Sequence, residues 1–366
     1  MVGMLLGGIV LGPQVLNLVG PSIIGLSLDI RKIALIVILI RAGLALNIKE
    51  LRQVGRPAIL MSFVPACFEM AVVVGVAPWL FGVSVLDAAI IGVVLAAVSP
   101  AVIVPKMLFL MENKIGTRKS IPQMIMSAGS IDDLFLITLF TVFTGLALGG
   151  SFTVASLAVV PVAIVIGVAV GVAVGWGVTC FFRLVPLRDT AKVLVILSLS
   201  FLLVKVEALL DGIVPFSSFL AVMALGIALL RYYEPLAQRL SAKFSKVWVG
   251  AELLLFVLVG VSLDIDYAMQ AGLSAGLLIF LALLGRMVGV YVSLLGTPFS
   301  MRERLFCMLA YIPKATVQAA IGSIPLAMGL ECGTLVLTVA VLSILITAPL
   351  GAFAIDLSYR SLLEQD

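Results

Sequence analysis

The chain has 366 residues, of which 63% are hydrophobic and only 11% are charged, and its formal net charge is +4. Soluble domains are about 45–50% apolar and about 25% charged, so this composition excludes a soluble globular fold and predicts an all-α polytopic membrane protein. Histidine is absent, which removes the usual metal ligand and the usual proton carrier near neutral pH. The cysteines are scattered without a paired spacing, so neither a disulfide nor a metal site is indicated.

Apolar segments follow one another along the whole chain. A helix needs about 20 mostly apolar residues to cross a hydrocarbon core of roughly 30 Å, and most of these segments have about that length. The sequence therefore predicts about 12 transmembrane helices, within the segments 2–19, 31–47, 57–81, 85–109, 121–148, 154–182, 191–210, 214–231, 247–264, 270–296, 303–329 and 333–356.

The basic residues alternate from loop to loop. Loops after odd-numbered segments hold only Arg31, Lys32 and Lys205. Cytoplasmic loops carry an excess of Lys and Arg, so we expect the loops after even-numbered segments and both termini of this chain to be cytoplasmic. The expected location is the plasma (inner) membrane. The loops after even-numbered segments and the C-terminal end hold Lys49, Arg52, Arg56, Lys106, Lys114, Arg118, Lys119, Arg183, Arg188, Lys192, Arg231, Arg239, Lys243, Lys246, Arg302, Arg304 and Arg360.

Two segments contain prolines where a helix should be continuous. The segment 85–109 contains "AVSPAVIVPKM", with Pro100 near the middle of the segment. The segment 303–329 contains "YIPKATVQAAIGSIP", in which the break is expected to begin at Pro313. Proline removes a backbone donor and clashes with the preceding turn, so both helices are expected to break. They run in opposite directions, which predicts two inverted five-helix repeats whose broken helices, the fourth and the eleventh, cross near mid-membrane. Such a matched pair points to the binding site of a transporter.

Three acids and two cations lie well inside the apolar segments. A charge at the bilayer centre costs at least about 2.5–3.5 kcal/mol on insertion scales, so these groups need partners or a purpose. They leave one net negative charge, as a site for one proton or one small monovalent cation requires. Arg41 would cancel it, but this side chain lies near the cytoplasmic end of its segment and can snorkel. The five buried charges are Glu69, Asp132, Asp133, Arg286 and Lys314.

The stretch "AGSIDDLFLITLF" holds two adjacent acids, Asp132 and Asp133. Neighbouring helix positions point about 100° apart, so the two cannot share one partner symmetrically. One acid can pair with a cation while the other faces a water-filled path. Burial favours the protonated form of a carboxyl and a nearby cation favours the charged form, so a carboxyl between these effects can bind either a proton or a metal cation. Competition for one site, coupled to alternating exposure, is antiport.

The helix breaks supply further candidate ligands. A backbone carbonyl such as that of Val98 and the hydroxyl of Ser99 can replace part of a cation's hydration shell, and Gly129 allows the backbone to approach closely. Thr316 and Gln318 are the polar residues of the second break, where they can satisfy freed backbone groups.

The motifs "SIDDLF", "AVSPAVIVP", "GRMVGVY" and "IPKATVQAAIG" resemble the sodium/proton exchanger domain-containing branch of the cation/proton antiporter superfamily, over essentially the whole chain. The resemblance implies a single sodium/proton exchanger transmembrane domain that works as an elevator. Its moving core would be about 57–148 and 270–356, its dimerisation scaffold about 1–47 and 191–264, and its linker helix about 154–182.

The resemblance also implies roles for the buried charges. Asp133 would be the main ligand for Na⁺, with Asp132 beside it, Arg286 opposite them, and Glu69 and Lys314 completing the charge network. Arginine does not lose its proton in proteins, so Arg286 predicts electroneutral exchange of one Na⁺ or Li⁺ for one H⁺.

The sequence therefore predicts a transporter rather than an enzyme. The transported ions are its substrates, no cofactor is expected, the partners are the lipid bilayer and a second copy of the chain, and nucleic acid is not a partner. Relatives normally have one more helix before "MLLGGIVLGP", so a truncated start is also expected.

Other functions are alternatives to antiport of Na⁺ or Li⁺. A K⁺/H⁺ antiporter stays open, because ion selectivity depends on cavity dimensions. A sodium-coupled organic-anion symporter on a similar scaffold would need a roomy cavity and more polar residues near the breaks. An intramembrane aspartyl protease needs its two acids on facing helices, whereas here they are adjacent on one. A passive channel needs a wetted polar stripe, and the segment beyond Asp133 is mostly apolar.

Overall fold

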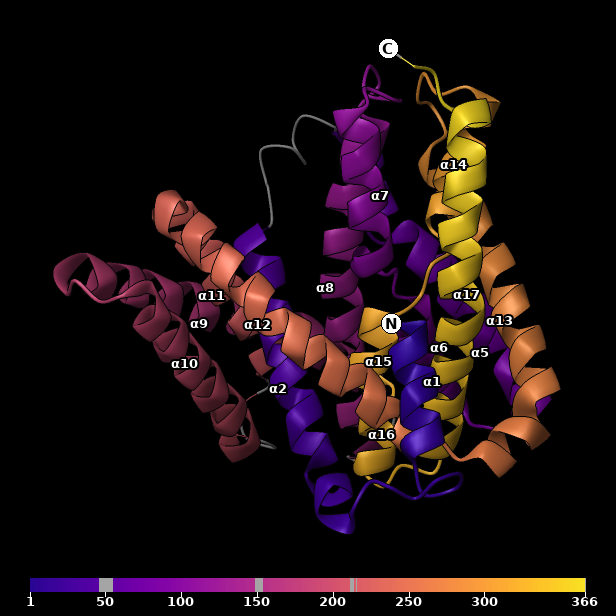
Figure 1. The fold of residues 1–366 in the computed structure, drawn as a ribbon, viewed down its shortest axis with the longest axis horizontal. Coiled ribbons are helices and arrows are strands. Elements are labelled where there is room, and N and C mark those ends of the chain that lie inside the picture. The colour runs from indigo at the N-terminus through magenta and orange to yellow at the C-terminus, as the bar shows by residue number, and fades with distance from the viewer. Residues whose placement is uncertain (46–54, 149–153, 211–213, 215, 366) are drawn as a thin grey trace. The chain divides into compact units, whose positions relative to one another are not determined.

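The computed structural model describes the whole chain except residues 46–54, 149–153, 211–213, 215 and 366 (Figure 1). The described residues are nearly all helical, with no strand beyond an isolated bridge between Ile115 and Gln365. Seven helical stretches within the described part are long and apolar enough to cross a membrane. All the segments predicted from hydropathy contain helix, so the prediction of an all-α polytopic membrane protein is confirmed.

The helices belong to two compact units. Unit 1 comprises Met1–Ile24, Asn47–Thr144 and Phe256–Asp366, and unit 2 comprises Gly25–Leu46 and Gly145–Leu255. The helices of unit 1 are α1 (Val2–Leu11), α4 (Arg56–Met61), α5 (Val64–Phe81), α6 (Val85–Ala96), α7 (Pro100–Glu112), most of α8 (Ile121–Leu148), α13 (Ile265–Ser293), α14 (Met301–Ala310), α15 (Thr316–Ile321), α16 (Ile324–Ala327) and α17 (Gly333–Leu362). Unit 2 holds most of α2 (Pro21–Ala45), α9 (Val154–Leu184), α10 (Asp189–Leu210), α11 (Ser218–Tyr232) and most of α12 (Glu234–Val261).

Unit 2 is built on close packing of α9 against α11. A Cβ built on Gly171 would lie 2.8 Å from the Cα of Ala221, and one on Gly175 would lie 2.7 Å from the Cβ of Ala228. Small residues let helix backbones approach in this way inside membranes. In unit 1, α13 also packs closely along α5 at a glycine, since a Cβ on Gly289 would lie 2.6 Å from the Cα of Pro65.

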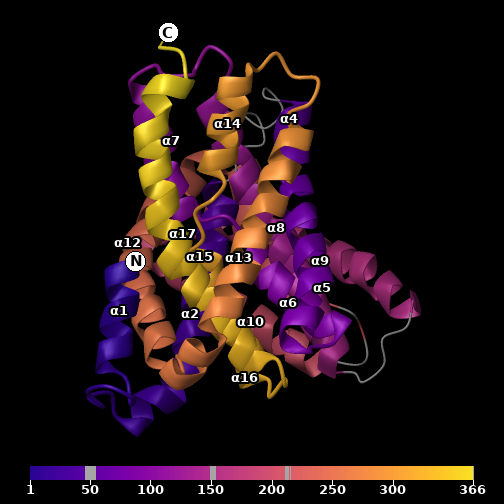
Figure 2. The same ribbon diagram turned by 90° about the vertical axis from the view of Figure 1, so that its right-hand side faces the viewer.

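Both helices expected to break do so. The fourth predicted span becomes α6 and α7, joined by the extended residues Ala97 to Ser99, and the eleventh becomes α14, α15 and α16, with non-helical residues Tyr311 to Ala315. The two interrupted helices run in opposite directions through unit 1 (Figures 1 and 2). Their breaks touch, because the backbone N–H of Ser99 donates to the carbonyl of Pro313 at 2.9 Å.

The span 57–81 is confirmed as an apolar helical stretch from Arg56 to Phe81, with a turn at Ser62–Phe63 between α4 and α5. Other predicted boundaries are wrong. Helix α2 begins at Pro21 rather than at 31, so Arg31 lies inside a helix and not in a loop. Its guanidinium donates one turn back, through Nη2 to the hydroxyl of Ser27 at 2.7 Å and through Nε to the carbonyl of the same residue at 3.1 Å, whereas its buried Nη1 has no partner among the described residues.

Lys32 likewise lies within α2 and Lys205 within α10. Helix α12 begins at Glu234 rather than 247, so Arg239, Lys243 and Lys246 are helical. The charged residues lower the local hydropathy without ending the helix. Lys49 and Arg52 lie outside the described residues.

The basic loops of unit 1 gather at one end of that unit, which we call the basic end. The N–H of Gly116 donates to the carbonyl of Glu364 at 2.8 Å, and Lys119 pairs with Glu303 at 2.8 Å. The C-terminal end of α17 lies at this end, beside the ends of α7 and α14 (Figure 2). The basic residues gathered here are Lys106, Lys114, Arg118, Lys119, Arg302, Arg304 and Arg360.

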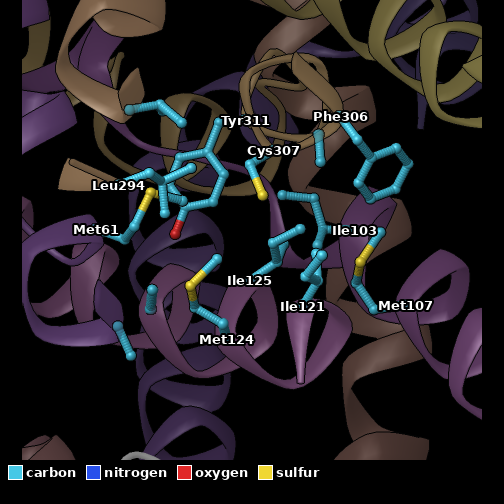
Figure 3. Close-up of a cluster of buried hydrophobic side chains, with 14 of the residues drawn as sticks. Met61, Ile103, Met107, Ile121, Met124, Ile125, Leu294, Phe306, Cys307 and Tyr311 are labelled. Carbon is cyan, nitrogen blue, oxygen red and sulfur yellow. The ribbon is translucent and has the colours of Figure 1, made fainter. Parts of the chain in front are cut away.

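A buried apolar cluster fills unit 1 between the second break and the basic end. Its side chains come mainly from α4, α7, α8, α13, α14 and α17, and the labelled ones include four sulfur-containing residues (Figure 3). Tyr311, the first residue of the break, projects into this cluster. The labelled members are Met61, Ile103, Met107, Ile121, Met124, Ile125, Leu294, Phe306, Cys307 and Tyr311.

We predict that Gly351→Ala lowers stability. Gly351 lies in α17 against the second break, and a Cβ there would lie 2.6 Å from Cδ of Pro313, whose ring has little freedom to move. Overpacking of this kind costs about 1–3 kcal/mol. Gly276→Ala in α13 is the matched control, because nothing lies within 4 Å of its Cβ position. The measurement is the Tm in detergent; equal Tm changes in the two variants would contradict the packing argument.

Candidate ion-binding site

A chain of buried ion pairs joins the core helices of unit 1. Arg286 of α13 donates through Nη1 to Oε2 of Glu69 in α5 at 2.7 Å and through Nη2 to Oδ2 of Asp132 in α8 at 2.9 Å. Lys314, in the second break, donates through Nζ to the same Oε2 of Glu69 at 2.7 Å. All four side chains are at most 1% exposed. Two acids therefore neutralise two cations inside the unit.

The adjacent acids are not equivalent. Oδ2 of Asp132 also accepts the backbone N–H of Val98 at 3.2 Å, so this carboxylate is fixed by both Arg286 and the first break. Asp133 forms no ion pair within the described residues, and its buried Oδ1 has no hydrogen-bond partner there. Asp133 is also 8% exposed, whereas Asp132 is 0% exposed. One acid is paired with the arginine, and the other has no ion pair among the described residues.

The freed carbonyls of the first break have specific partners. The amide nitrogen of Gln318 donates to the carbonyls of Leu95 at 3.3 Å and Ala97 at 2.6 Å. Arg286 Nη1 donates to the carbonyl of Ala96. Gln318 therefore links α15 to the end of α6, as its expected role in satisfying the break requires. In the second break, the backbone N–H of Lys314 donates to the hydroxyl of Thr347 in α17 at 2.9 Å.

The remaining candidate ligands lie around these breaks. Val98 contributes its N–H to Asp132, which hydropathy and prolines alone did not indicate. A Cβ on Gly129 would lie 3.9 Å from Cγ1 of Val98, so α8 passes close to the first break. The hydroxyls of Ser99 and Thr316 are buried and have no partner within the described residues.

Tyr311 is a site residue that the sequence reasoning missed. Its ring covers one face of the Arg286 guanidinium, with 5.3 Å between Cζ and the ring centroid. Cation–π contact of this kind holds a guanidinium without consuming an N–H donor. The tyrosine directly precedes the Ile-Pro of the break. This position beside the break was the only feature of the sequence that could have indicated a role in the site.

Arg41 belongs to α2 in unit 2, where Glu252 of α12 is its electrostatic partner. Within unit 1, the described residues of the candidate site are three acids and two cations, and Asp133 is the acid without an ion pair among them.

Comparison with known proteins gives consistent results. The family described as sodium/hydrogen exchanger, transmembrane, matches residues 1–356. The chain is 33% identical to sodium/hydrogen exchanger 9B2 of Xenopus tropicalis over 352 residues, covering 93% of this chain and 64% of that protein. It is 32% identical to human sodium/hydrogen exchanger 9B1 over 343 residues, covering 88% and 64%. The chain thus spans about 64% of the length of these relatives.

A solved structure supports the fold. The chain is similar to the sodium proton antiporter MjNhaP1 from Methanocaldococcus jannaschii at pH 8, with a TM-score of 0.84 and 18% identity, over 99% of this chain and 92% of that one. At this identity the likeness concerns the fold alone. The family match over nearly the whole chain, together with the apolar helices, shows that this integral multi-pass membrane protein belongs to the sodium/hydrogen exchanger family.

Proposed function

We propose that this chain is a secondary active antiporter that exchanges Na⁺ or Li⁺ for H⁺, and that Asp133 binds either ion. The observation that carries the proposal is that the two adjacent acids differ in their ion pairs. Asp132 is paired with Arg286, while Asp133 has no cationic partner within the described residues. The names of the relatives, sodium/hydrogen exchanger and sodium proton antiporter, support the same substrates.

The charge balance explains why exchange would be obligatory. Glu69 and Asp132 cancel Arg286 and Lys314, so the site carries one negative charge when Asp133 is ionised and empty. Either a proton or a monovalent cation on Asp133 brings the total to zero. An uncompensated charge is costly within the membrane, so the site moves readily only when loaded. The family transports ions, and the function is accordingly transport rather than catalysis, with no cofactor.

The proposed cycle is electroneutral and elevator-like. Arg286 keeps its proton, so only Asp133 binds and releases ions, one cation in exchange for one proton. The core of about 57–148 and 270–356 would move against a scaffold of about 1–47 and 191–264, connected by the helix at about 154–182. We further propose a homodimer in the plasma membrane, with the basic end of unit 1 and both termini of this chain in the cytoplasm, following the positive-inside rule.

In proteoliposomes, Asp133→Asn should abolish sodium-driven proton movement, because the amide keeps the shape of the side chain but holds neither a proton nor a charge. Folding should be preserved or improved, since an unpaired buried carboxylate is removed. The control is Asp266→Asn, which removes an exposed acid at the start of α13. Proton movement is followed with a pH-sensitive dye after pulses of sodium, lithium or potassium. Wild-type rates in Asp133→Asn would place the ion site elsewhere.

Sodium affinity should fall with acidity. If one proton leaves Asp133 for each Na⁺ bound, the apparent Kd rises by up to about tenfold per pH unit below the pKa of that carboxyl, equivalent to about 1.4 kcal/mol. Above that pKa the Kd becomes independent of pH. Isothermal titration calorimetry between pH 5 and pH 9 in buffers of different ionisation enthalpy measures both the Kd and the proton release. A Kd that stays constant over this range would refute competition.

Exchange should not respond to membrane potential. A potassium gradient with valinomycin sets the potential across the proteoliposome membrane while the sodium and proton gradients are held constant. The exchange rate is expected to stay the same from zero to about 100 mV, because a net charge moved across that potential would be worth about 2.3 kcal/mol. A strongly voltage-dependent rate would mean that a second proton moves, with Asp132 or Lys314 as the group to test next.

A further inference from the structure

A cavity of about 580 Å³ lies between α7 and α17 at the basic end of unit 1. The two helices are joined there by Lys106, whose Nζ contacts both oxygens of Asp356 at 2.6 and 2.5 Å. They are also joined by an edge-on contact of Phe109 with Tyr359, with ring centroids 6.0 Å apart. The cavity lies away from the buried ion pairs described above, and nothing in the proposed exchange cycle uses it. The lining residues are Pro105, Lys106, Phe109, Asp356, Leu357, Tyr359 and Arg360.

The charges of the cavity do not cancel. Lys106 and Asp356 neutralise one another, which leaves Arg360. Its Nε donates to the hydroxyl of Tyr359 at 2.9 Å, and its guanidinium lies over that ring at 5.6 Å. Within the described part of the chain, no carboxylate forms a salt bridge with Arg360. The cavity therefore has one net positive charge, carried by a planar group suited to phosphate oxygens.

The apolar surface below the cavity continues toward mid-membrane. On α17, an outward row of large side chains leads up to the cavity, from Ile346 through Leu350 and Phe353 to Leu357, which is 80% exposed. Phe109 of α7 is 46% exposed beside this row. With 1.5 Å rise per residue, Arg360 lies about 40 Å along α17 from Gly333, beyond a hydrocarbon core of roughly 30 Å. By the same rise, Ile346 to Phe353 lie about 20–30 Å from Gly333, at acyl-chain depth, and Leu357 lies at the border with the headgroup region that holds Arg360.

We propose that this cavity binds an anionic phospholipid, with the phosphate at Arg360 and one acyl chain along the row Ile346–Leu357. Basic pockets between helices on the cytoplasmic side are suited to acidic headgroups. A zwitterionic lipid offers no net charge to match Arg360, and free phosphate leaves the apolar row uncovered. The lipid bridges α7, which starts at the first break, and α17, whose Thr347 accepts the N–H of Lys314. Its binding stabilises the packing of the core.

The test uses the full chain in detergent and needs no transport assay, so its outcome is independent of the proposed antiport. Phosphatidylglycerol should raise the Tm in a concentration-dependent manner, by about 3 °C near saturation, and native mass spectrometry should show a retained lipid. Phosphatidylcholine, inorganic phosphate and glycerol phosphate should leave the Tm unchanged. Arg360→Gln should lose the shift, and Leu357→Gln should reduce it by breaking the apolar row.

The matched control is Arg302→Gln, which removes an exposed positive charge at the same end but outside the cavity. It should keep the full Tm shift. The proposal is overturned if Arg360→Gln and the wild type respond equally, if Arg302→Gln loses as much as Arg360→Gln, or if phosphate alone reproduces the shift. The last result would identify an anion site without a lipid.

Discussion

The guanidinium of Arg286 is the group on which the architecture of unit 1 depends. It joins α5 through Glu69, α8 through Asp132 and the end of α6 through the carbonyl of Ala96. A buried arginine is tolerated only when its partners are in place, and removing one partner of a buried pair typically costs about 3–5 kcal/mol. The planar guanidinium donates to two carboxylates through separate nitrogens, and a lysine ammonium cannot do this in the same fixed geometry. This commitment of Asp132 is what leaves Asp133 free.

The two helix breaks meet the same requirement, which is that every buried polar group needs a partner. A broken helix inside a membrane exposes backbone groups that must find partners within the protein. Here the carbonyls of Leu95 and Ala97 are taken by Gln318, that of Ala96 by Arg286, and that of Pro313 by the N–H of Ser99. Because these partners come from the opposite break or from the ion-pair chain, the two breaks hold one another in place. Polar groups that have no partner in the described part of the chain, such as the Ser99 hydroxyl, lie at these same positions.

Much of this arrangement could be predicted from sequence, for identifiable reasons. Hydropathy located the helices, prolines located the breaks, and the cost of burying charge singled out the acids and cations of unit 1. Which acid pairs with Arg286 could not be predicted, because it depends on the rotation of α8 about its axis. The role of Tyr311 was not predicted, because its contact with Arg286 depends on how the second break folds. Helix α2 was expected to start late because charges lower its hydropathy, although Arg31 inside it donates locally to Ser27.

The need for two adjacent acids follows from counting charges under the proposed antiport. With Asp133 alone, Glu69 would face both Arg286 and Lys314, and the site would have no net charge when empty and a positive charge when sodium is bound. Such a site would repel its substrate and could move empty, so the two ions would not be coupled. Asp132 changes this by neutralising Arg286 permanently. The empty site then carries the unfavourable charge and each loaded site carries none, which is the condition for strict exchange.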